Sequence, residues 1–150
     1  MRRTIRPANK LEAAYQEAAR GLGCVICRHL MEIGRLSPKA GQCGATRIHH
    51  RNMGDLHGQK QLGQHAVVAL GDWHHDGIPP MFWGDAEAEG IYGPSFKFAK
   101  PFRAWTAELF PEIPGRGTEV WQAVQDRMLI EQGFGDLVDA VRDQQIKDAA

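Results

Sequence analysis

The chain has 150 residues, with 18 basic and 18 acidic side chains and a formal net charge of zero. This length fits one domain that buries a modest core, so we expect a single domain over residues 1–150. A neutral total argues against a dedicated high-affinity nucleic-acid binder but leaves room for local basic patches. The sequence shows no secretory signal and no run of about 18 apolar residues, so a cytoplasmic location without a membrane span is expected.

Helices are predicted on both sides of a mixed centre. The arginine-containing residues 1–7 are expected to form a disordered basic tail, and apolar residues at helical spacing predict a helix over 8–21. In the C-terminal part, residues 95–147, similar patterns predict three helices, over 95–110, 118–132 and 136–147. The region between them, including residues 78–95, is expected to be mostly irregular.

The centre is predicted as strand, loop, strand and short helix. Residues 46–51 are expected to form a short strand, and 52–64 a polar, glycine-rich loop. The run His-Ala-Val-Val-Ala-Leu at 65–70 predicts a buried strand. Asp72 is then expected to cap a short helix that carries the next histidines.

Histidines are concentrated in this centre. All seven histidines lie between Cys27 and Asp76, and four of them form two adjacent pairs, His49-His50 and His74-His75. Adjacent residues on a helix point about 100° apart, so the second pair cannot easily hold one ion together. We therefore expect two sites, one for each histidine of that pair.

The cysteines indicate a structural zinc site. Cys24 and Cys27 form a C-x2-C pair, whose thiolates are ligands that zinc prefers. His74 is the expected third ligand, and Cys43 is the first candidate for the fourth, with Asp72 behind it. The simpler interpretation is that the pair is two small buried residues. A redox role is disfavoured because no thioredoxin-like strand–helix–strand pattern surrounds the pair.

These motifs together resemble the HNH (His-Me finger) nucleases, and more narrowly the phage recombination-enhancement, Ref-type nucleases that act with the RecA recombinase. The resemblance covers roughly residues 22–110, and an HNH-like core is expected over 22–77. It rests on Cys24-x2-Cys27, Ile48-His49-His50-Arg51, His65-Ala66-Val67-Val68-Ala69-Leu70 and Trp73-His74-His75-Asp76-Gly77. It implies an α+β fold with a ββα-metal core, a zinc-binding C-x2-C, and flanking N- and C-terminal helices.

The resemblance also implies roles for single residues. His49 and His75 match the ligands of the catalytic metal, and His50 matches the general base. His65 is the nearest match to the residue that orients this base, and His74 matches a zinc ligand. Arg51 or Lys60 would hold neighbouring phosphates.

Two positions depart from the family pattern. The family usually has a cysteine where this chain has Gly71, so Cys43 would have to compensate. No histidine follows His75 after one helical turn, where Pro79 lies, so the metal would keep several waters, which suits Mg²⁺ or Mn²⁺.

The implied activity is metal-dependent endonuclease hydrolysis of single- or double-stranded DNA, leaving a 5′ phosphate and a 3′ hydroxyl. A phage origin and a RecA-type filament as partner are expectations of the same resemblance. The alternative is a non-catalytic, zinc-stabilised module that binds DNA or a recombination protein. His50→Ala separates the two, because a binding module needs no base beside a second metal.

Overall fold

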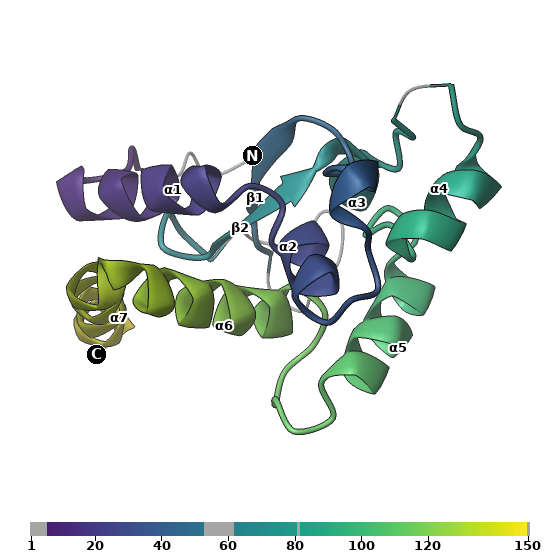
Figure 1. Ribbon diagram of the computed structural model, residues 1–150. Coiled ribbons are helices and arrows are strands. Elements are labelled where there is room, and N and C mark those ends of the chain that lie inside the picture. The colour runs from purple at the N-terminus through teal and green to yellow at the C-terminus, as the bar shows by residue number, and fades with distance from the viewer. Residues whose placement is uncertain (1–5, 53–61, 81, 150) are drawn as a thin grey trace.

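The computed structural model describes residues 6–52, 62–80 and 82–149 of the chain. The fold is α+β, with a two-stranded antiparallel sheet lying among helices (Figure 1). In chain order the elements are α1 (Lys10–Leu22), α2 (Val25–Glu32), η1 (Pro38–Ala40), β1 (Thr46–His50), β2 (Val67–Gly71), α3 (Asp72–Asp76), α4 (Asp85–Tyr92), α5 (Ala99–Leu109), α6 (Thr118–Leu129), η3 (Ile130–Phe134) and α7 (Gly135–Ala149).

The first helix begins at a capping box. Asn9 accepts a hydrogen bond from the backbone N–H of Glu12, and the Glu12 carboxylate accepts one from the backbone N–H of Asn9. These bonds pair amide groups that a helix start leaves open. Arg6 adds an ion pair to Glu12 at 2.7 Å. Residues 1–5 of the predicted basic tail lie outside the described residues.

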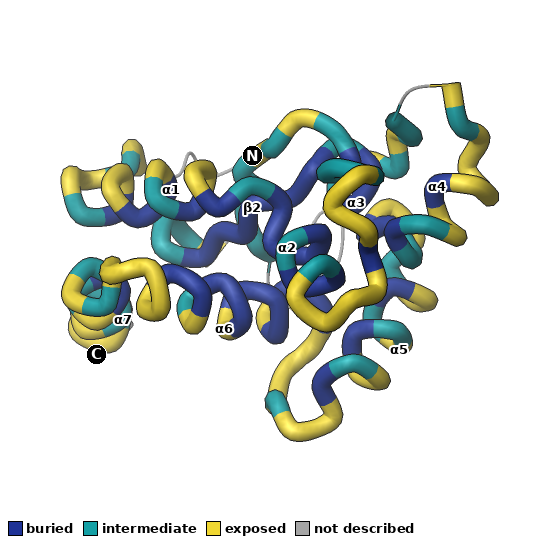
Figure 2. Tube along the Cα trace, viewed as in Figure 1, coloured by how far each residue is buried: buried dark blue, intermediate teal, exposed yellow. Residues whose placement is uncertain are grey.

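The sheet is short, and its second strand is wholly buried. β1 pairs with β2 in a register that runs from Thr46 opposite Gly71 to His50 opposite Val67. Every residue of β2 is buried, whereas β1 is partly exposed. Helices α1, α2, α3 and α6 all pack against β2. Figure 2 shows the consequence: α1 and α6 turn buried residues toward the sheet and exposed residues outward.

Side chains of α6 close the edge of β2 that β1 leaves open. Gln125 accepts a hydrogen bond from the Ala69 N–H at 2.8 Å and donates one to the Val67 carbonyl at 3.0 Å. One turn earlier, Gln122 donates to the carbonyl of His65 at 2.8 Å. Two glutamines on a helix thus provide the hydrogen bonds that a third strand would otherwise supply.

Several predicted element boundaries are wrong. Helices α2 and α4 lie where the sequence pattern predicted none. Helix α5 begins at Ala99 instead of residue 95, which leaves Pro101 in its first turn, where a proline is tolerated. Asp72 does not cap α3: Gly71 holds the cap position, and the Asp72 side chain bonds to Arg47 and to the Ala45 N–H instead.

Within the described residues, no helix is both long and apolar enough to cross a membrane.

We expect Gln125→Met to lower the free energy of unfolding by about 2 to 4 kcal/mol, since it keeps the side-chain length but leaves two buried backbone groups unpaired. Urea unfolding followed by circular dichroism measures this change. Gln144→Met, on α7, is the matched control and should shift the value by less than about 0.5 kcal/mol. Equal effects of the two substitutions would show that the edge contacts contribute little.

Candidate metal centre

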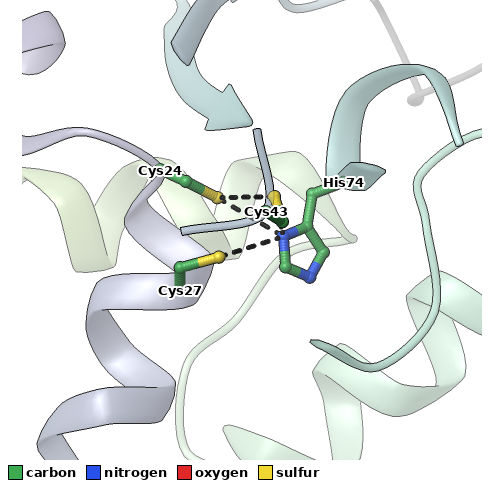
Figure 3. Close-up of side chains that lie close together, drawn as sticks. All are labelled: Cys24, Cys27, Cys43 and His74. Atoms are coloured by element: carbon green, nitrogen blue, oxygen red, sulfur yellow. Dashed lines mark hydrogen bonds between the residues drawn. The ribbon is translucent and has the colours of Figure 1, made fainter. Parts of the chain in front are cut away.

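Three buried cysteines and one buried histidine meet in the core. Cys24, Cys27, Cys43 and His74 place their ligand atoms within 4.8 Å of one another (Figure 3). Among the described residues, no other group of three or more such side chains comes together in this way. The three thiols are free, with no disulfide between them.

The distances fit a tetrahedral zinc ion. With Zn–S of about 2.3 Å and Zn–N of about 2.05 Å, a tetrahedron separates two sulfurs by about 3.8 Å, and sulfur from nitrogen by about 3.6 Å. The Sγ atoms of Cys24 and Cys43 are 3.9 Å apart. The Nδ1 atom of His74 lies 3.4 Å from Cys24 Sγ, 3.7 Å from Cys27 Sγ and 3.1 Å from Cys43 Sγ. The cluster fits a structural zinc site, and Cys43, the first of the two candidates for the fourth ligand, belongs to it, whereas Asp72 does not.

Three separate segments deliver the ligands. Cys24 is the residue before α2 and Cys27 lies in its first turn, so helix geometry turns both thiols to one side. Cys43 comes from the loop before β1, where its carbonyl accepts a hydrogen bond from the Trp73 N–H at 3.1 Å. Gln42, beside it, accepts one from the Cys24 N–H at 2.7 Å. The loop is thereby tied to both α2 and α3.

Gly71 lies directly beside the third thiol. A Cβ atom at position 71 would fall 2.4 Å from Cys43 Sγ and 3.5 Å from Cys24 Cβ. The Cys43 sulfur therefore occupies the place where a side chain of residue 71 would begin. The chain lacks the expected cysteine at position 71, and Cys43 delivers its sulfur to the same corner of the cluster.

A hydrogen bond on the side of the ring opposite to the sulfurs orients His74. Its Nε2 atom lies 2.7 Å from the Tyr92 carbonyl, the last residue of α4. Because a carbonyl can only accept, Nε2 carries a hydrogen, and Nδ1 is the nitrogen that faces the three sulfurs. Trp105 of α5 stacks on the imidazole, with ring planes 10° apart.

The side chains of the cluster shift one another's pKa values. Burial alone would raise the pKa of Cys24, but hydrogen bonds from Cys27 and Cys43 and the charge of His74 hold it well below its usual value. Burial also disfavours a charged His74, yet the Cys24 and Cys43 sulfurs raise its pKa to about 10. Hydrogen bonds with Cys24 and Cys43 raise the pKa of Cys27, so without metal the negative charge resides on Cys24. A bound metal would require the thiols as thiolates and His74 as the neutral imidazole.

His75 faces a different part of the molecule. Its Nε2 atom lies 3.2 Å from Nδ1 of His49 on β1, and the two rings meet edge to face. Its other nitrogen, Nδ1, lies 2.9 Å from a carboxylate oxygen of Asp76. Nδ1 nevertheless has no hydrogen-bond partner among the described residues, so the carboxylate lies beside the ring without fixing its tautomer.

The spacing of this pair also suits a shared ion. Two imidazole nitrogens held at about 2.1 Å from one metal lie roughly 3.0 to 3.4 Å apart at right-angle or tetrahedral geometry. The Phe96 ring packs against His49 with centroids 4.8 Å apart and forms one wall. Arg47 precedes His49 by two residues and so shares its face of the strand. Its guanidinium bonds to Asp72 at 2.7 Å, and its side chain is 54% exposed.

The structure places the remaining predicted residues elsewhere. His50 follows His49 on a regular strand, so its side chain leaves the opposite face. Burial and the charge of Arg20 on α1 lower the pKa of His50. His65 precedes β2, and burial together with Arg142 of α7 lowers its pKa. The roles predicted for His50 and His65 stay predictions.

The two predicted phosphate-binding residues have different outcomes. Arg51 bonds to Gln122 at 2.6 Å and to Thr118 at 3.3 Å, and its side chain is only 12% exposed. Its guanidinium thus ties the end of β1 to α6. Lys60 lies outside the described residues.

Sequence reasoning missed three groups that shape these sites: the Asp76 carboxylate, the Arg47 guanidinium and the Tyr92 carbonyl. Strand alternation would have placed Arg47 on the same face as His49, so a signal for it existed. Nothing local indicated the carbonyl, which the unpredicted helix α4 positions.

In comparisons with known proteins, no protein-family model, curated protein or solved structure matches this chain.

We expect purified protein to contain one zinc ion per chain, and Gly71→Ala to release it, because the new Cβ would collide with the Cys43 sulfur. Elemental analysis gives the zinc content, and thermal unfolding reports the accompanying loss of stability. Gly90→Ala is the matched control, since a Cβ there meets nothing within 4 Å. Full zinc retention in Cys43→Ala would contradict the assignment of Cys43 as the fourth ligand.

Proposed function

We propose that this protein is a metal-dependent endonuclease that hydrolyses DNA phosphodiester bonds with a ββα-metal centre of the HNH type. The observation that carries the proposal is the pair His49 and His75, with Asp76 behind it. Strand β1 supplies the first histidine and α3, which follows β2 directly, supplies the second. This order of elements is the one that the resemblance implies.

The donor set favours a particular class of cation. Imidazole nitrogen suits Mn²⁺ and the later transition metals better than Mg²⁺, which prefers oxygen. Of the two expected cofactors, Mn²⁺ is therefore the better fit to His49 and His75. When bound, such a cation would supply electrostatic stabilisation to the charge that develops on the phosphate oxygens.

The protein's own groups would perform the remaining tasks. Asp76 places a negative charge beside Nδ1 of His75, and Nε2 of the same ring faces His49. Arg47 would donate hydrogen bonds to a phosphate oxygen, since its half-exposed guanidinium lies on the same face. The resemblance implies His50 as the proton acceptor, but its side chain lies on the face of β1 opposite to His49, so this role stays a prediction that His50→Ala tests.

The neighbouring zinc cluster supports this function indirectly. It is buried and offers four protein ligands, which is typical of structural sites, whereas catalytic sites keep positions open. His75 is partly exposed and has one histidine, His49, beside it, so a metal bound to these two residues would keep open positions. We therefore assign a structural role to the site that contains His74 and a catalytic role to the site that contains His75.

We expect His49→Ala and His75→Ala to abolish cleavage of supercoiled plasmid or single-stranded DNA in Mn²⁺, while both variants keep their zinc. Asp76→Asn should reduce the rate by about 10- to 100-fold, since it removes the carboxylate charge beside His75. Asp143→Asn on α7 is the matched control and should cut at the wild-type rate. The readout is loss of supercoiled DNA, with EDTA as the blank.

Cleavage that survives in both histidine variants would overturn the proposed centre. A recombinase filament on single-stranded DNA is the further substrate to test, because the resemblance implies a RecA-type partner. Absence of cleavage there as well would favour the zinc-stabilised binding module. Cleavage that persists in His50→Ala would remove only that residue from its role.

Arg47 and Arg51 should behave in opposite ways. We expect Arg47→Ala to slow cleavage at least tenfold and to change the free energy of unfolding by less than about 1 kcal/mol, because its ion pair is exposed. Arg51→Ala should cost about 1 to 3 kcal/mol of stability, because it removes part-buried hydrogen bonds. Urea unfolding and the plasmid assay, run on both variants, separate these effects.

A further inference from the structure

A basic and aromatic strip follows the candidate active site along α5. Residues 93–107 contain three cationic side chains and no acidic one, in a chain whose net charge is zero. We call the residues Lys97, Phe98, Lys100 and Arg103 the α5 strip. Lys97 and Phe98 come just before the first residue of α5, and Lys100 and Arg103, three residues apart, lie on one side of the helix.

These cations are not engaged by acids. The ion pairs formed among the described residues involve neither Lys97 nor Lys100 nor Arg103. Both lysines are exposed, and Arg103 is half-buried. A run of unpaired positive charge repels itself, so its most favourable partner is an external anion.

The aromatic member of the strip is exposed as well. Helical spacing predicts Phe98, Phe102, Trp105 and Leu109 on one core-facing side. Phe102 is indeed fully buried, but Phe98 is 49% exposed. The ammonium of Lys97 lies 5.8 Å from the centre of the Phe98 ring. An exposed ring flanked by cations offers a flat apolar surface within a region that attracts anions.

The strip starts at the candidate active site. The Lys97 side chain crosses Gly77, the residue that ends α3, so closely that a Cβ there would lie 2.9 Å from Lys97 Cδ. Phe96, one residue earlier, packs against His49 and donates its N–H to the His74 carbonyl. From this point α5 leads away from α3 (Figure 1).

The far end of the strip opens into a cavity. Arg103 and Arg116 both line it, together with apolar residues such as Phe110 and Val120, and its volume is about 480 Å³. Arg103 and Arg116 therefore bring two cations together at this end of the strip.

We propose that the α5 strip binds single-stranded nucleic acid that flanks the cleaved bond, an inference that rests on the proposed function. The cations would contact successive phosphates, and Phe98 would stack on an unpaired base. Phosphate contacts alone need no aromatic surface, and the bases of a duplex are already stacked on each other. The exposed ring between cations therefore favours a single strand over a duplex.

The test measures binding without cleavage. Fluorescence anisotropy of a labelled oligothymidylate is recorded on the zinc-loaded protein without added Mg²⁺ or Mn²⁺, at several salt concentrations. Lys100→Ala with Arg103→Ala should weaken binding at least tenfold and reduce the slope of log affinity against log salt by about 0.7 for each lost phosphate contact. Lys39→Ala with Lys147→Ala removes the same charge elsewhere and should leave the slope unchanged.

Phe98→Leu tests the aromatic contact. It should weaken binding of the single strand at least about fivefold, and binding of a DNA hairpin duplex less than twofold. Equal losses on both DNAs, or no loss on the single strand, would overturn the inference. Binding that depends on the strip in a protein that never cleaves would reject the proposed function alone. Cleavage with a strip-independent affinity would reject the inference alone.

Discussion

The buried contact of three sulfurs with one imidazole determines the orientation of α3. This helix has five residues and lies at the end of a two-stranded sheet, so its own hydrogen bonds fix its direction weakly. His74 ties it to α2 and to the loop that carries Cys43. Since neighbouring side chains on a helix diverge by about 100°, fixing His74 among the sulfurs also decides where His75 points.

That constraint links stability to chemistry. His75 meets His49 only if α3 keeps its rotation, and the rotation depends on the contacts of His74 with the cluster and with the Tyr92 carbonyl. Loss of one thiol would therefore change the position of His75 relative to His49, although the thiol contacts neither residue. His49 and His75 can lie at a partly exposed surface because the buried cysteine–histidine cluster holds α3 in place.

The ligand set was predictable from the sequence because zinc ligands are a small class of residue types. Cys43 was identified from its type alone, although the reason for its position, the missing side chain at Gly71, appears only in three dimensions. The two helices that were missed explain the rest. Helix α2 is amphipathic, but it has only eight residues and overlaps the C-x2-C, whose spacing indicates a metal motif. Helix α4 contains Gly90 and has a weakly apolar face. Without α4 the carbonyl behind His74 could not be foreseen.

The two glutamines of α6 also affect how this protein meets other chains. An open strand edge invites a strand from another molecule, and repeated addition of this kind leads to fibrous aggregates. Gln125 and Gln122 already engage the outward-facing groups of β2, so an incoming strand would first have to displace an entire packed helix. A sheet of only two strands thereby becomes resistant to templated growth along its most apolar strand.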